Sequence, residues 1–183
     1  NLTAARYLSE EPLPLQDRDI VEFVADIFAK AASLAPLRGL ETRLVCAADS
    51  HICAFCPDAL EQLLYQLLSN AFKFTPAGGL ITVELRLSGG RVFLSVEDTG
   101  PGIDPERQET LFDSYHQAEQ PAPQPQGLGL GLALCRGIAQ GHGGVITAES
   151  HQGKGTRVTF SMPDRVSGTA LSDLRFDYGG GFN

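Results

Sequence analysis

The sequence contains no apolar run that approaches the roughly 20 residues needed to cross a bilayer, and it carries no recognisable secretory signal. It also lacks an excess of basic residues, because 14 Lys and Arg stand against 22 Asp and Glu, a net charge of -8. Nucleic-acid binders usually carry a basic face, so this charge argues against a nucleic-acid partner. It does not exclude a phosphate ligand, since glycine-loop amides and a few local cations are enough to hold one. The first residue is Asn1 rather than Met, which indicates a segment of a longer protein.

The cysteines do not form the dense framework of a disulfide-stapled domain, since only four occur in 183 residues. They are Cys46, Cys53, Cys56 and Cys135. Cys53 and Cys56 form one CxxC pair with His51 nearby, which raises the question of a metal site. A zinc site normally needs two such pairs. We therefore expect reduced cysteines that pack as small apolar residues.

Three segments carry apolar residues at helical spacing. The first runs from Asp19 to Ala35 and is ended by Pro36 and Gly39. The second is opened by Pro57 and has a leucine-rich face. The third spans residues 129–140 and is closed by glycines, and residues 105–112 suggest a further short helix.

Alternating apolar residues predict the strands. The clearest case is a hairpin of "LITVELRL" and "RVFLSVED" around a Ser-Gly-Gly turn, and a second hairpin pairs 145–150 with 156–162. Residues 43–47 suggest a short strand, and residues 165–183 form a tail in which Leu174, Phe176 and Tyr178 alternate as in an edge strand. Hairpins with interspersed helices predict an α+β fold, a two-layer sandwich whose mostly antiparallel sheet has helices on one face.

Three glycines at alternate positions, Gly127, Gly129 and Gly131, lead directly into the third helix. They do not form a P-loop, because the sequence contains no Gly-Lys-Ser/Thr. They do not form the GxGxxG/A dinucleotide fingerprint either, because its sixth position would be Leu132 or Leu134 and a proline-rich loop precedes it. The glycines must therefore be interpreted together with the rest of the chain.

Five stretches occur in a fixed order: "LLYQLLSNAFKFTPAGG", "VEDTGPGI", "LFDSYHQ", "GLGLGLALCRGIAQGHGG" and "GKGT". Together they closely resemble the N, G1, F, G2 and G3 boxes of the ATP-binding catalytic domain of sensor histidine kinases. This family shares its Bergerat-type fold with gyrase, Hsp90 and MutL. The opening "NLTAARYL" is similar to the end of the dimerisation helix that precedes such domains. The resemblance thus implies a helix end and linker over 1–14, the ATP-binding domain over 15–164 and a tail over 165–183.

In the N box, the resemblance implies that Asn70 is the ligand of Mg²⁺, for which a carboxamide oxygen is a suitable hard donor. Lys73, three residues on, shares the same helix face and is expected to meet phosphate. Phe74 resembles the position whose ring contacts the base. Gln66 stands where the family usually has Asn or Glu; it can bind a water but cannot act as a general base.

In the G1 box, the resemblance implies that Asp98 accepts a hydrogen bond from the adenine amino group and so selects adenine over guanine. Gly100 and Gly102 would let the backbone turn tightly near the base. Ile103 and, in the F box, Phe112 are implied as further nucleotide contacts.

In the G2 box, the glycines are expected to act as a hinge and to present backbone N–H groups to the phosphates at a helix start. Leu128, Leu130 and Leu132 would anchor this hinge, and residues 114–126 would form a lid over ATP. Thr156 in the G3 box would support the floor of the pocket. The lid contains no Lys or Arg, and His116 is its only candidate cation.

The implied function is transfer of the γ-phosphoryl group of Mg-ATP to a histidine on a separate dimerisation domain, with a response regulator downstream. The acceptor motif is absent, since none of the histidines (His51, His116, His142 and His151) lies in it. A nucleotide-binding sensor or scaffold module without catalysis is the alternative that Gln66 and the neutral lid favour. An anti-sigma-type serine kinase shares the boxes, but the helix remnant at the start argues against it. The resemblance further implies a cytoplasmic location without membrane insertion by this segment, and leaves open an inner-membrane anchor in the parent protein.

Overall fold

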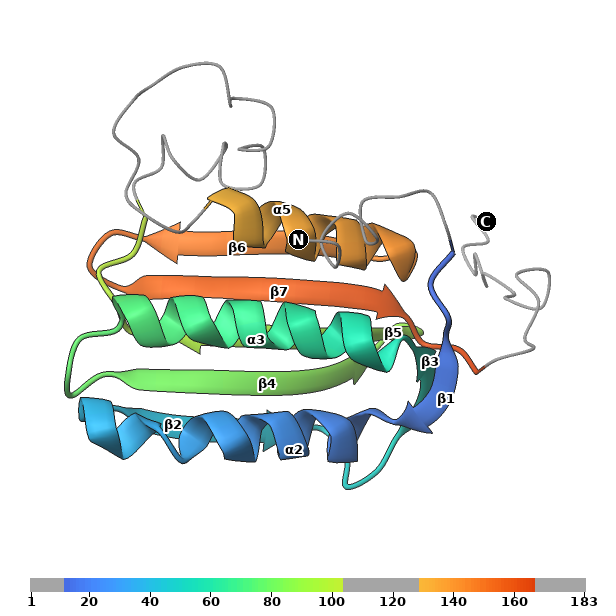
Figure 1. Ribbon diagram of the computed structural model, residues 1–183, viewed down its shortest axis with the longest axis horizontal. Helices are drawn as coiled ribbons and strands as arrows, with labels where there is room; N and C mark the ends of the chain where they lie inside the picture. The colour runs from blue at the N-terminus through green and yellow to red at the C-terminus, as the bar shows by residue number, and fades with distance from the viewer. Residues whose placement is uncertain (1–11, 104–128, 167–183) are drawn as a thin grey trace, which may run out of the picture.

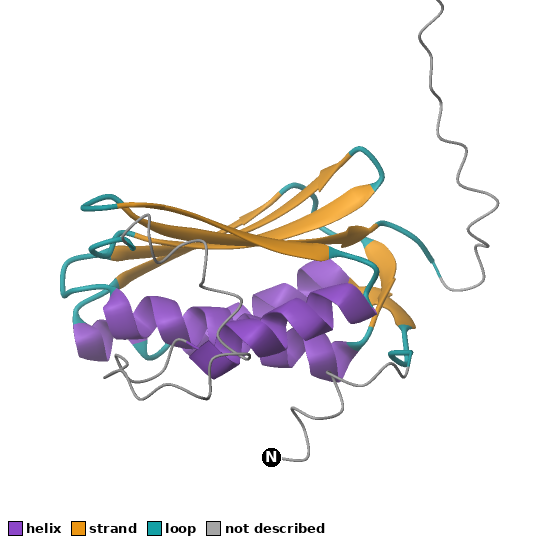
Figure 2. Cartoon of the chain, turned by 90° about the horizontal axis from the view of Figure 1, so that it is seen from above, coloured by secondary structure: helices purple, strands orange, loops and turns teal. Residues whose placement is uncertain are grey.

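The computed structural model describes residues 12–103 and 129–166, with residues 129 and 130 described by their backbone alone. One layer is a five-stranded sheet and the other consists of helices that cover a single face of it (Figures 1 and 2). The strands lie in the order β2-β4-β5-β7-β6. Only β2 and β4 pair in parallel, while the other neighbours are antiparallel. This arrangement confirms the predicted two-layer α+β fold.

The sheet is built from both predicted hairpins and from the short strand predicted over 43–47, which is β2. Their bounds are β2 (Glu41–Cys46), β4 (Leu80–Ser88), β5 (Arg91–Asp98), β6 (Val145–His151) and β7 (Gly155–Pro163). In β4 the alternate residues Ile81, Val83 and Leu85 are buried against the helices, as the period of two requires. Both hairpin predictions are therefore confirmed.

The helix layer contains α2 (Ile20–Ala32), α3 (Pro57–Phe74) and α5 (Gly129–Gly141). Asp19 caps α2, because its Oδ1 accepts from the Val21 N–H at 2.9 Å. The predicted continuation of this helix to Ala35 is wrong: α2 ends at Ala32, and the short 3-10 helix η1 (Ala35–Arg38) follows. The α-helical pattern has already changed at Leu34, whose N–H donates to the Ala31 carbonyl, and Pro36 then has no N–H to continue the helix.

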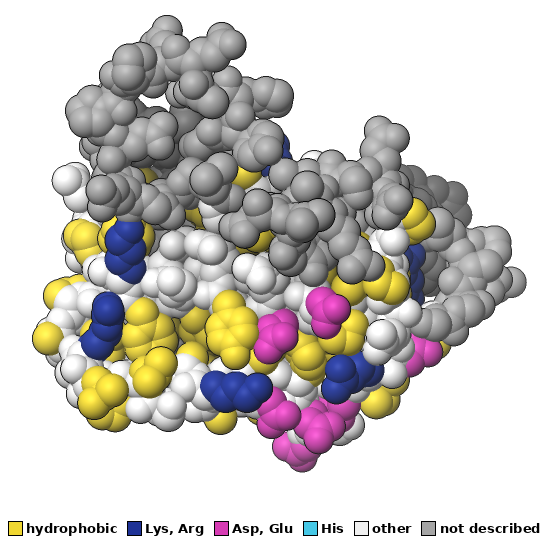
Figure 3. Space-filling view, viewed as in Figure 1, with side chains coloured by type: hydrophobic (Ala, Val, Ile, Leu, Met, Phe, Trp, Pro, Cys, Tyr) yellow, Lys and Arg dark blue, Asp and Glu magenta, His cyan; other side chains and the backbone are white. Residues whose placement is uncertain are grey.

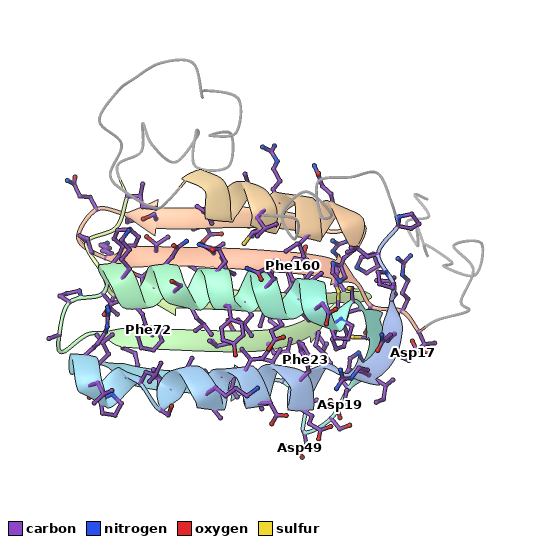
Figure 4. All side chains as sticks on the ribbon, viewed as in Figure 1. Asp17, Asp19, Phe23, Asp49, Phe72 and Phe160 are labelled. Atoms are coloured by element: carbon purple, nitrogen blue, oxygen red, sulfur yellow. The ribbon has the colours of Figure 1, made fainter. Side chains whose placement is uncertain are left out.

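The core lies between the helices and the covered face of the sheet. Leu60 and Leu64 of α3 and Phe160 of β7 are fully buried there (Phe160 is labelled in Figure 4). Each such side chain contributes about 1.5–3 kcal/mol relative to its exposed state. The core therefore holds α3, the middle helix, firmly against the centre of the sheet.

A second, two-stranded sheet joins β1 (Gln16–Asp19) and β3 (Ile52–Phe55) in antiparallel fashion at one end of the molecule (Figure 1). Neither strand was predicted, because "QDRD" is entirely polar and "ICAF" has no alternation. The Ala54 N–H also donates to the Arg165 carbonyl at 2.6 Å, so the chain is still tied to the domain at that residue.

Several predictions lie outside the described residues. They concern the helix end over 1–8, the short helix over 105–112, the lid over 114–126 and the alternating residues of the tail. The four cysteines are described: all have free thiols, and Cys53, Cys56 and Cys135 are buried, as expected for small apolar residues. In the same described ranges, no helix is both long enough and apolar enough to cross a membrane.

Candidate functional site

Most of the candidate residues within the described ranges lie at one end of the main sheet. At this end α3 and β5 finish, α5 begins, and the β6–β7 turn closes (Figure 1). Figure 4 places Phe72, near the end of α3, at this edge and Asp17 and Asp19 at the opposite edge. The fold thus brings the N, G1, G2 and G3 segments together although they are far apart in the sequence.

Asp98 is the last residue of β5 and is half-buried. Its Oδ1 accepts from the Gly100 N–H at 2.8 Å. Burial raises the pKa of the Asp98 carboxyl, the hydrogen bonds from the backbone N–H groups of Gly100 and Thr156 oppose this change, and nearby Glu97 adds to it. The carboxyl is therefore fixed in direction by two amides, and it retains acceptor capacity for a further donor.

Gly100 allows β5 and α3 to approach each other at this point. A Cβ at this position would lie 2.7 Å from Asp98 Oδ1 and 2.9 Å from the Phe74 carbonyl oxygen. Contacts of this length are closer than real Cβ atoms adopt, so any larger residue would push the Asp98 carboxyl or the end of α3 away. Gly102 follows with φ of 74°, a conformation that favours glycine.

Ser150, at the end of β6, ties this turn to the β6–β7 hairpin. Its Oγ accepts from the Ile103 N–H at 2.7 Å and lies 2.9 Å from Thr156 Oγ1. Thr156 pairs with Asp98 across β5 and β7. Sequence reasoning missed Ser150, because a serine within "VITAES" carries no signal of its own; its role depends on the strand pairing.

Asn70, Gln66 and Gly131 form the second part of the site. Gln66 lies one helical turn before Asn70 on α3, and its Nε2 donates to Asn70 Oδ1 at 3.4 Å. A Cβ on Gly131 would lie 2.1 Å from Gln66 Nε2 and 2.3 Å from Gln66 Cδ. The absence of a side chain at Gly131 therefore lets the first turn of α5 lie directly against Gln66.

Lys73 and Phe74 end α3. Lys73 is exposed, and its Nζ lies 5.2 Å from the centroid of the half-buried Phe74 ring. Leu132 of α5 is buried in the core. Of the remaining candidates, Gly129 and Leu130 begin α5 and have only their backbone described, and Phe112, Gly127 and Leu128 lie outside the described residues.

Comparison with known proteins identifies the family. A family model described as "Histidine kinase-, DNA gyrase B-, and HSP90-like ATPase" matches residues 56–166, more than half of the chain. The chain belongs to this family. The resemblance inferred from the sequence boxes is thereby confirmed.

Curated proteins with similar sequences include a histidine protein kinase and a sensory kinase. The histidine protein kinase DivJ of Caulobacter vibrioides is 46% identical over 105 residues, which cover 57% of this chain and 18% of DivJ. The adaptive-response sensory kinase SasA of Parasynechococcus marenigrum is 34% identical over 149 residues, which cover 81% of this chain and 39% of SasA. The matched region therefore spans less than half the length of each of these relatives.

Solved structures share the fold of this chain. Full-length ShkA in complex with AMPPNP superposes with a TM-score of 0.77 at 27% identity, covering 91% of this chain and 35% of ShkA. The nucleotide-free catalytic domain of the histidine kinase ThkA gives a TM-score of 0.72 at 23% identity, covering 84% of this chain and 97% of that domain. At its lower identity, the ThkA comparison supports the fold alone.

Proposed function

We propose that this domain binds Mg-ATP and transfers its γ-phosphoryl group to a histidine on a separate dimerisation domain, as the catalytic domain of a sensor histidine kinase. The observation that carries the proposal is the convergence of Asp98, Asn70 and Gly131 at one end of the sheet in a member of this ATPase family. The similarity to the histidine protein kinase DivJ supports histidine as the acceptor.

The adenine would be recognised by Asp98. Its carboxyl is oriented by the amides of Gly100 and Thr156, so it would accept a hydrogen bond from the exocyclic amino group at little cost in reorganisation. Guanine presents a carbonyl oxygen at that position, which would leave the half-buried carboxylate facing an acceptor without a donor. Sites of this kind discriminate strongly between substrates. Phe74 and Ile103 border the same turn and are proposed as further base contacts, together with Phe112.

The phosphates would lie between Asn70 and the start of α5. Backbone N–H groups at a helix start favour anions, and the residues proposed to line this end are Gly127, Leu128, Gly129, Leu130 and Gly131. Lys73 would add a positive charge from α3. The ATP analogue in the ShkA complex is consistent with a triphosphate ligand in this fold.

Asn70 fits a magnesium ion, because its carboxamide oxygen is a hard, neutral donor on a rigid helix beside the proposed phosphate site. Mg²⁺ would supply charge neutralisation at the phosphates when bound there. Gln66 would orient the Asn70 carboxamide through the hydrogen bond from its Nε2. Since Gln66 cannot act as a base, the domain's own contribution is positioning and electrostatic stabilisation.

The acceptor histidine and the response regulator belong to other domains or chains in this proposal. We also propose residues 15–164 as the folded domain; the start of β1 at Gln16 and the end of β7 at Pro163 support these bounds. A cytoplasmic location follows from the proposed function, since ATP and the response regulator are found there.

The test is phosphotransfer from radiolabelled ATP to a separately produced histidine-acceptor domain of the parent kinase. We expect label on the acceptor histidine with this chain, and a loss of at least roughly a hundredfold with Asn70→Ala, in line with the loss of a preorganised electrostatic contact. Ser69→Ala, an exposed neighbour on α3, is the matched control and should retain the rate. Equal rates for Asn70→Ala and the parent would remove Asn70 from the mechanism. ATP binding without transfer would instead support the non-catalytic module, and label on serine would support the anti-sigma-type kinase.

A further inference from the structure

A second cluster of polar side chains lies at the opposite end of the domain from the nucleotide site. It consists of His51, Cys53 and Asp164. His51 Nε2 and Asp164 Oδ1 are 2.8 Å apart, and the ligand atoms of all three residues lie within 4.8 Å of one another. A thiol, an imidazole and a carboxyl thus share one small volume that the proposed kinase reaction does not use.

The backbone explains this proximity. His51 and Cys53 are separated by one residue at β3, so their side chains project from the same side of the strand. Asp164 follows the last residue of β7, and the next residue, Arg165, is held to β3 by the hydrogen bond from Ala54. The His51 N–H donates to Asp19 Oδ1 at 3.2 Å. All three side chains therefore start from fixed backbone rather than from loose loops.

We propose that His51, Cys53 and Asp164 form a zinc site, with water as the fourth ligand. Thiolate, imidazole and carboxylate together suit Zn²⁺ better than the hard ions Mg²⁺ or Ca²⁺, which prefer oxygen alone. Bond lengths of about 2.0–2.3 Å at a tetrahedral centre require donor separations of roughly 3.3–3.6 Å. The three donors reach these separations if His51 Nε2 and Asp164 Oδ1 move apart by about half an ångström and both atoms move towards the Cys53 sulfur.

The exposure of the three residues provides an entry path. Cys53 is fully buried, whereas the side chains of His51 and Asp164 are each 25% exposed. An ion and its water would enter from the His51–Asp164 side and meet the sulfur beneath. Zn²⁺ binds the thiolate, so the Cys53 proton would be released to solvent when the metal binds.

Acidic residues lie near the three proposed ligands. Figure 3 shows several acidic side chains near the start of α2, with Lys and Arg side chains among them, and Figure 4 labels Asp17, Asp19 and Asp49 in this part of the domain. Asp19 is not itself a proposed ligand, because its oxygens already accept from the backbone and from Ser50.

The CxxC pair is thus not the metal-binding unit. Cys56 is the N-cap residue of α3 but makes no side-chain capping hydrogen bond, and its N–H donates to His142 Nε2 at 3.0 Å. A bound ion would connect β3 to the segment after β7 and stabilise the end of the domain remote from the nucleotide. The proposal does not depend on the kinase function, and its test uses no nucleotide.

The test is titration of the full, reduced, metal-free chain with Co²⁺, followed by displacement with Zn²⁺. We expect one ion per chain, a thiolate-to-cobalt charge-transfer band, the intense visible absorption of a tetrahedral site and a higher thermal midpoint with Zn²⁺. Cys53→Ala should abolish the charge-transfer band. Asp164→Asn should lower the affinity for Zn²⁺ at least roughly tenfold, measured by competition with a chelator. Cys46→Ala, at a half-buried cysteine outside the cluster, is the matched control and should retain the band.

Absence of the charge-transfer band in the parent chain would overturn the proposal, and so would its retention in Cys53→Ala. If Cys53→Ala does not fold, as judged by circular dichroism, the partly exposed Asp164 decides the question. An unchanged Zn²⁺ affinity in Asp164→Asn would then contradict the site.

Discussion

The close contact between Gly131 and Gln66 gives the sharpest mutational prediction. Alanine at position 131 gains about 1 kcal/mol of helix propensity over glycine. Its Cβ would lie 2.1 Å from Gln66 Nε2, so the Gln66 carboxamide must rotate away and lose its 3.4 Å hydrogen bond to Asn70. That bond is long, so its loss costs near the lower end of about 0.5–1.5 kcal/mol. The two changes nearly cancel, and we expect Gly131→Ala to change the free energy of unfolding by less than about 1 kcal/mol.

Binding should respond differently from stability. With Gln66 displaced, Asn70 loses its orienting partner. We therefore expect Gly131→Ala to weaken Mg-ATP binding about tenfold, or by about 1.4 kcal/mol. Urea unfolding and calorimetric titration measure the two quantities. Because the affected residues are in contact, Gly131→Ala and Gln66→Ala should be non-additive in Mg-ATP affinity. Additivity within about 0.5 kcal/mol would refute the proposed contact. A loss of stability above about 2 kcal/mol in Gly131→Ala would contradict the expected rotation of the Gln66 carboxamide.

Three further predictions concern stability and turnover. Burial lowers the pKa of His142 from 6.5, so its stabilising contribution is full above pH 6.5 and is lost as the pH falls towards the lower pKa of the folded state. In urea unfolding, His142→Gln should flatten the dependence of the unfolding free energy on pH. An unchanged pH dependence would contradict the assignment. Gly155→Ala places a Cβ 1.8 Å from the Asp98 carbonyl oxygen at φ of 96°. We therefore expect the free energy of unfolding to fall by more than about 2 kcal/mol, and a fall of less than about 1 kcal/mol would be inconsistent with this geometry. A coupled ATPase assay should show hydrolysis far below the enzyme median of about 10 s⁻¹, because Gln66 cannot serve as a base, and turnover near that value would indicate a base that we have not identified.

The sequence predicts the elements whose burial is regular. The leucine stripe of α3 and the alternation of β4 and β5 gave type and position correctly, because each element buries one face against a single core. The proline and glycine signals likewise gave the start of α3 and the end of α5. The ordered boxes then brought Asn70, Asp98 and the glycines into one hypothesis.

The remaining features depend on tertiary structure. β1 is polar and short, and it becomes a strand only because β3 offers a partner. The hydrogen bonds of Ser150 and the close contact of Gly131 with Gln66 form between segments that are far apart in the chain. The same is true of Asp164, which is 113 residues from His51 yet pairs with it.

The central claim is that Asp98 makes this end of the sheet an adenine site, and calorimetry with ATP and GTP tests it most directly. In Asp98→Asn the amide oxygen can still accept from Gly100, but a charge-assisted hydrogen bond worth about 1.5–3 kcal/mol is lost. We predict that the parent chain binds ATP and strongly prefers it to GTP. Asp98→Asn should weaken ATP binding roughly ten- to hundredfold, whereas Glu97→Gln, a change at the exposed neighbouring residue, should leave ATP binding unchanged. An unchanged ATP affinity in a folded Asp98→Asn variant would contradict the account.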